Sequence, residues 1–151
     1  MNTFERELSK IFTGCKSIDN PTFVGSACYG DVAPDLKAKI QFVTMGRADY
    51  YEALRITMLN RTEGQVDAIT MRLSDLLGKK RTANFPEAVY PHIWKYRDEV
   101  EWYAYQPTPA DYKIIREAAA SYLDVFRQPL PEIAKPASKT KCTSKSRSQA
   151  R

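Results

Sequence analysis

The sequence predicts an α+β domain, in which an antiparallel sheet of about five or six strands carries N-terminal and C-terminal helices packed on one face. Apolar residues recur at helical spacing near both ends of residues 1–128, and they alternate with period two between those ends. The length of 151 residues fits one ordinary domain. Residues 1–128 are therefore expected to form a single domain, and residues 129–151 to form a disordered basic tail.

A short amphipathic helix is predicted from about residue 3 to residue 13. Asn2 and Glu5 have the spacing of a capping box, in which each side chain binds a free amide at the start of the helix. The apolar stripe along this helix consists of Phe4, Leu8, Ile11 and Phe12. Gly14 can then take the left-handed conformation that ends many helices.

Several strands are predicted next. The run "PTFVGSACYGDV" from Pro21 favours an extended strand, in which Gly25 and Gly30 allow a bulge or a turn. Residues 36–45 show a period of two, and residues 53–59 and 68–73 alternate on either side of a polar turn at 60–64, as in a hairpin. A helix is the rival structure for residues 50–59. Residues 74–78 look like a single capped turn.

The stretch "YPHIWKYRDEVEWYAY" at 90–105 holds both tryptophans and the single histidine. A two-residue turn at Asp98-Glu99 would pair Lys95 with Trp102, Trp94 with Tyr103 and His92 with Tyr105. One face of this hairpin is expected to join the core: Ile93, Val100, Trp102 and Ala104. The other face is the candidate protein-binding surface, made of Tyr90, His92, Trp94, Tyr103 and Tyr105. Aromatic packing inside the protein and stacking on unpaired bases are its alternatives.

A second helix of about 18 residues is predicted near the C-terminus. It begins at Thr108-Pro109-Ala110-Asp111, which places a capping threonine before a proline at the first helical position. Its stripe consists of Tyr112, Ile115, Ala119, Tyr122, Leu123 and Phe126, and it ends near Gln128-Pro129.

The net charge of +5 is concentrated in the tail. Residues 1–132 contain 17 Lys and Arg against all 18 Asp and Glu, whereas residues 133–151 contain six bases and no acid. The tail could solubilise the chain, tether it to phosphates, or fold on an acidic partner. The candidate nucleic-acid contacts are Lys79, Lys80 and Arg81 in a predicted basic loop, with Lys135, Lys139, Lys141, Lys145 and Arg147 in the tail.

No catalytic signature was found in the sequence. It contains no phosphate-binding glycine loop, no G-x-S-x-G and no H-E-x-x-H. Three widely spaced cysteines, Cys15, Cys28 and Cys142, indicate no disulfide framework, and two of them are expected to be small buried groups. A metal-dependent nuclease is the third-ranked function. Its carboxylates would be Asp31 with Asp35, or Asp98 with Glu99 and Glu101. No metal or cofactor is expected.

The run "KIQFVTMGRADYYEALRITMLNRTEGQVDAITMRLSDLLG" and the later run "HIWKYRDEVEWYAYQPTPADYKIIREAAASYLDVF" resemble small uncharacterised proteins of bacterial phages, plasmids and conjugative elements. The resemblance covers roughly residues 21–126 and carries no known catalytic motif. It implies an accessory factor of a mobile element, of the kind that includes anti-CRISPR proteins.

The first functional expectation is therefore a non-enzymatic binding protein that covers a surface of a host protein or ribonucleoprotein, as an inhibitor of a host defence nuclease would. The alternative is a DNA- or RNA-binding accessory protein that uses the basic tail. The longest apolar run is far short of a membrane span, and the N-terminus lacks a basic, then apolar, signal segment. A cytoplasmic protein is expected.

Overall fold

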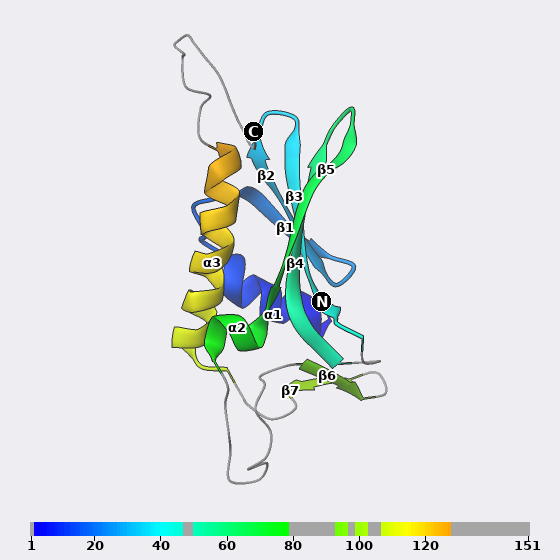
Figure 1. Cartoon of the computed structure of the whole chain (residues 1–151), viewed down its shortest axis with the longest axis vertical. Coiled ribbons are helices and arrows are strands. Elements are labelled where there is room, and N and C mark those ends of the chain that lie inside the picture. Colours follow the sequence, from blue (N-terminus) through cyan, green and yellow to red (C-terminus); the bar gives the residue numbers. More distant parts are fainter. Residues whose placement is uncertain (1, 47–49, 79–92, 97–98, 103–106, 128–151) are drawn as a thin grey trace, which may run out of the picture.

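The computed structural model describes residues 2–46, 50–78, 93–96, 99–102 and 107–127, and Figure 1 shows their arrangement. The helices are α1 (Thr3–Phe12), α2 (Leu73–Leu77) and α3 (Pro109–Arg127). The strands are β1 (Asp19–Val24), β2 (Ala27–Ala33), β3 (Leu36–Thr44), β4 (Tyr50–Asn60), β5 (Gly64–Arg72), β6 (Ile93–Tyr96) and β7 (Glu99–Trp102). The predicted tail lies outside the described residues.

All seven described strands belong to one antiparallel sheet, in the order β1-β2-β3-β4-β6-β7, and β5 also pairs with β4. The α+β class is confirmed. The sheet has one strand more than the upper limit of the prediction. The extra strand arises because the run from Pro21 turns back on itself and forms both β1 and β2. Val24 pairs with Ala27, and Gly25 and Ser26 between them both have positive φ, at 64° and 67°. Positive φ at both central residues is the geometry of a two-residue hairpin turn.

The three described helices lie on one side of the sheet (Figure 1). The capping box of α1 forms as predicted, with 2.8 Å between the Glu5 amide nitrogen and Asn2 Oδ1. Thr108 caps α3, since its hydroxyl accepts a hydrogen bond from the Asp111 amide at 3.3 Å. Both helix predictions are confirmed, and their apolar stripes face the sheet.

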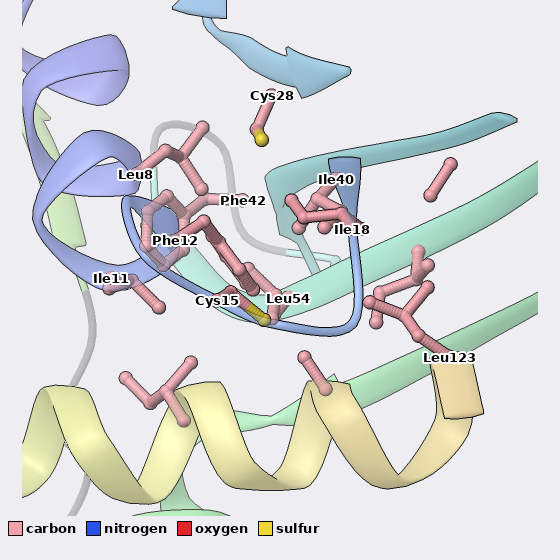
Figure 2. Packing of buried hydrophobic residues seen from close by; sticks show 14 of the residues in the cluster. Leu8, Ile11, Phe12, Cys15, Ile18, Cys28, Ile40, Phe42, Leu54 and Leu123 are labelled. Carbon is pink, nitrogen blue, oxygen red and sulfur yellow. The ribbon is translucent and has the colours of Figure 1, made fainter. Parts of the chain in front are cut away.

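The core fills the space between the helices and the sheet. Leu8, Ile11 and Phe12 of α1 point toward Ile40 and Leu54 of the sheet, and Leu123 enters from α3 (Figure 2). These six side chains are fully buried. Alternation along β3 and β4 therefore gives one apolar side under the helices and one polar side, as expected of a sheet covered on one face. The strand prediction for residues 53–59 is confirmed over its helical rival.

The β6–β7 hairpin has a register different from the predicted one. Lys95 pairs with Val100 and Ile93 with Trp102, two residues away from the predicted pairing of Lys95 with Trp102. No Asn-Gly or Asp-Gly pair marks the turn in this sequence, so the turn position was poorly specified. A shift of two residues preserves the alternation of faces. Ile93 is fully buried in the core, as predicted.

Among the described residues, no helix is long and apolar enough to cross a membrane.

Candidate functional site

Most of the residues singled out by sequence lie outside the described part of the chain. These are Tyr90, His92, Tyr103 and Tyr105 of the aromatic set, and Lys79, Lys80, Arg81, Lys135, Lys139, Lys141, Lys145 and Arg147 of the basic set. Trp94 is described only in its backbone, which pairs with Tyr50 at the start of β4. This pairing joins the aromatic stretch to the main sheet. Both predicted sites stay predictions.

A different set of residues comes together on the side of the sheet that faces away from the three helices. Lys37 and Lys39 alternate with the buried Ala38 and Ile40 along β3. Because neighbouring strands pair in register, side chains at paired positions share a face. Arg55 of β4 and Arg72 of β5 fall on this same side. We call Lys37, Lys39, Arg55 and Arg72 the basic face.

The basic face runs diagonally across three strands. Lys39 is paired with Thr57, Gln41 with Arg55, and Val43 with Ala53, which is in turn paired with Arg72. From Lys37 to Arg72 the diagonal covers six residue steps along the strands, about 20 Å, and two strand spacings, about 10 Å. The four cations thus form a line and not a compact cluster.

Few acidic groups oppose these cations. Among the paired positions of β2 to β5 on this side, the one acidic residue is Asp31. Its carboxylate is 3.9 Å from Lys37 Nζ. Both side chains are about half exposed, so this pair adds little stability. Within the described part of the chain, no carboxylate forms an ion pair with Lys39, Arg55 or Arg72. Among the described residues, the basic face therefore carries more positive than negative charge.

Tyr29 of β2 lies beside this line of cations. It is paired with Lys39, and the Lys39 ammonium is 6.0 Å from the centroid of the Tyr29 ring, near the outer limit of a cation–π contact. The same row continues across the sheet through Thr57 and Ala68. These two side chains are small, and Lys39 lies between them and the half-buried Tyr29.

Several carboxylates are instead engaged on the helix side of the sheet. The buried Glu7 accepts a hydrogen bond from the Tyr112 hydroxyl, and Asp67 accepts one from the Tyr122 hydroxyl. Burial, followed by these hydrogen bonds, raises the pKa of both tyrosines above the ordinary value of 10. Their phenols stay neutral and act as hydrogen-bond donors. The fold thus separates these acids from the basic face.

A groove of about 860 Å³ opens at one end of the sheet, between the β2–β3 turn, the end of β4 and the last residue of α3. Its charged lining is paired: Arg127 with Asp19 at 3.3 Å, Arg61 with Asp35 at 3.4 Å, and Lys37 with Asp31. Because each cation already has a carboxylate, the groove carries no net charge. It favours neither an anion nor a cation.

The structure also places the carboxylates considered for a metal site. Asp31 and Asp35 both line the groove, where Asp31 is bonded to Asn20 and Lys37, and Asp35 is paired with Arg61. In the described residues, no group of three or more His, Cys, Asp or Glu side chains is arranged to hold a metal ion. The second acidic group, around Asp98, lies outside the part for which side chains are described.

The predicted burial of two cysteines is confirmed. Cys15 and Cys28 are both buried and carry free thiols. Burial, with a smaller effect from Cys15, raises the pKa of the Cys28 thiol to about 12. A thiol held neutral is a packing group rather than a nucleophile.

The basic face was not predicted from the sequence. The alternation in residues 36–45 did identify the side of that strand that carries Lys37 and Lys39. The alignment of these lysines with Arg55 and Arg72 depends on strand register, which the sequence did not specify. No family model, curated protein or solved structure matches this chain.

Proposed function

We propose that this protein acts by binding and not by catalysis, and that the basic face of its sheet holds an anionic surface of a macromolecular partner. The observation that carries the proposal is the line of four cations, with Asp31 paired to Lys37 at one end, on a side of the sheet that none of the three described helices covers. Three of these cations have no carboxylate partner in the described residues.

Electrostatics selects the kind of partner. Like charges brought together at an interface cost several kcal/mol, about the free energy of many weak complexes, so a basic partner surface is disfavoured. An anionic polymer or an acidic protein surface gains instead from each cation it meets. The open face of a sheet suits a broad contact better than a small molecule in a deep pocket.

The basic face favours nucleic-acid binding over inhibition of a defence nuclease, which reverses the order of the two functions expected from the sequence. A basic face is poorly suited to occupying the nucleic-acid channel of a defence nuclease, because such channels are themselves positively charged. The nucleic-acid alternative gains support, through the sheet and not only through the tail. The origin in a mobile element and the inhibition of a defence nuclease stay predictions.

The test compares two charge-reversal variants of the full chain on immobilised heparin. One variant is Lys39→Glu with Arg55→Glu on the basic face. The matched control is Lys16→Glu with Lys113→Glu, which changes the charge equally at two exposed lysines outside that face. The tail is identical in both proteins, so its contribution cancels. Circular dichroism and thermal melting check that both variants fold.

The basic-face variant is expected to elute at clearly lower salt than both the control and the unaltered chain. Since each lost cation–anion contact also lowers the dependence of binding on salt, its salt slope should be shallower. Elution of the two variants at the same salt would show that the basic face is not the binding surface. A milder pair, Lys39→Gln with Arg55→Gln, serves if charge reversal disturbs the sheet.

A further inference from the structure

We infer that the anionic partner is a single-stranded nucleic acid, which lies along the basic face and stacks a base on Tyr29. This inference rests on the proposed function and adds the identity of the ligand. It combines two observations: the line of cations and the aromatic ring beside it.

The line of cations suits a chain of phosphates. Lys37, Lys39, Arg55 and Arg72 are spread along a diagonal about 20 Å long and not gathered around one point. A single phosphate or a small anion would meet one or two of them. A polymer that carries a charge at every repeat can meet all four, as nucleic acids do in grooves that follow their backbone.

Tyr29 supplies an aromatic ring on which a base can stack, which cations alone do not offer. Aromatic side chains on a sheet are a recurring platform for unpaired bases, because every base has a π-face. The ring of Tyr29 is half-buried, so its orientation is held before a ligand arrives. The Lys39 ammonium lies over this ring, 6.0 Å from its centroid, so a stacked base would take its place and leave the ammonium to bind a neighbouring phosphate.

The shape of the surface favours an unpaired strand over a duplex. Duplex recognition commonly inserts a helix or a two-stranded ribbon into a groove about 12 Å wide. The row of Tyr29, Lys39 and Thr57 instead runs across three neighbouring strands of the sheet, and all three side chains are partly buried. A splayed strand can lie along such a row.

The test measures binding of the full chain to a labelled 12-nucleotide oligo(dT), to an oligo(U) of equal length, and to a 12-base-pair duplex, by fluorescence anisotropy at fixed salt. The single strands are expected to bind at least about fivefold more tightly than the duplex. The basic tail cannot create this preference, because the duplex has the higher charge density and gains more from non-specific cations. Comparison of oligo(dT) with oligo(U) shows whether the 2′-hydroxyl contributes.

Two variants at one position separate stacking from charge. Tyr29→Leu keeps an apolar side chain but loses the π-face, and should weaken single-strand binding by about 5- to 150-fold, the range for one base–aromatic stack. Tyr29→Phe keeps the ring and should bind like the unaltered chain. Lys39→Gln should lower the slope of log affinity against log salt by about 0.7 for single strands.

A further measurement needs no substitution. Photo-crosslinking of the unaltered chain to an oligonucleotide that contains 5-iodouracil should yield a crosslinked peptide from β2 that includes Tyr29. The inference is overturned if the duplex binds as tightly as the single strands, if Tyr29→Leu folds and binds normally, or if the crosslinks map away from β2. If heparin retention still depends on Lys39 and Arg55 in that case, the basic face stands and its partner is a different polyanion, such as an acidic protein.

Discussion

The hydroxyl of Tyr112 on α3 donates a hydrogen bond to the carboxylate of Glu7 on α1. The two residues are 105 positions apart in sequence, and this bond joins the N-terminal helix to the C-terminal helix above the sheet. Glu7 is 8% exposed, and its second carboxylate oxygen is 3.2 Å from Lys10 Nζ. The contact therefore links α1 and α3, two of the three described helices that cover the core.

Tyr112→Phe should lower the free energy of unfolding by about 1–3 kcal/mol, because it leaves a buried carboxylate without one of its donors. Tyr122→Phe is the matched control, since it removes the same hydroxyl from Asp67, which is exposed and can bind water instead. Urea unfolding monitored by circular dichroism measures both. Equal losses from the two variants would contradict the structural role of Glu7.

The carboxyl group of Glu5 makes the stability of the protein vary with pH in the acidic range. Hydrogen bonds from the backbone of Asn2, and then of Ser26, lower the pKa of its carboxyl below the ordinary value of 4.5. The carboxylate therefore stabilises the fold fully above about pH 4.5, and this contribution is lost as the pH falls through the lower pKa of the folded state.

The stability difference between the unaltered chain and Glu5→Gln should accordingly be largest near neutral pH and should shrink below pH 4.5. Urea midpoints at pH 7, 5, 4 and 3 measure this difference. Glu63→Gln, in the exposed turn before β5, is the control. A difference that stays constant across these pH values would show that the Glu5 carboxylate is not held by the capping box.

Cys28 should resist thiol reagents while the protein is folded. With its pKa raised to about 12 from 9.0 by burial, the thiolate fraction at pH 8 falls roughly a thousandfold. In a Cys142→Ser background, labelling by Ellman's reagent followed by mass spectrometry should find Cys28 modified at the rate of unfolding. Modification at the rate of a free thiol would mean that the site between α1 and the sheet is open.

Gly30→Ala tests how closely the segment before β1 approaches the sheet. A Cβ at Gly30 would lie 3.0 Å from the Ile18 Cβ and 3.2 Å from its Cδ1. Glycine to alanine in a strand usually stabilises by restricting the unfolded chain, but here overpacking should dominate and cost about 1–3 kcal/mol. Thermal unfolding measures the sign, and a more stable variant would refute the close packing.

The elements that could be predicted are those with local signals. The capping boxes at Asn2 and Thr108, the apolar stripes behind them and the alternation in residues 36–45 each depend on residues within a few positions of one another. Gly25 was predicted only as a place for a bulge or a turn, and the predicted register of the β6–β7 hairpin was wrong by two residues. In both places the chain reverses without an Asn-Gly or Asp-Gly pair to define where.

By itself, the sequence determined the class of the fold, its helix boundaries and the near balance of charge over residues 1–132. Only the tertiary structure decided where that charge lies. Pairing of β3, β4 and β5 aligns Lys39, Arg55 and Arg72 on one side of the sheet, while Glu7 and Asp67 bond to tyrosines of α3 on the other. Local periodicity assigns each side chain to a face of its own strand, but strand register, set by packing of the whole core, decides which charges become neighbours.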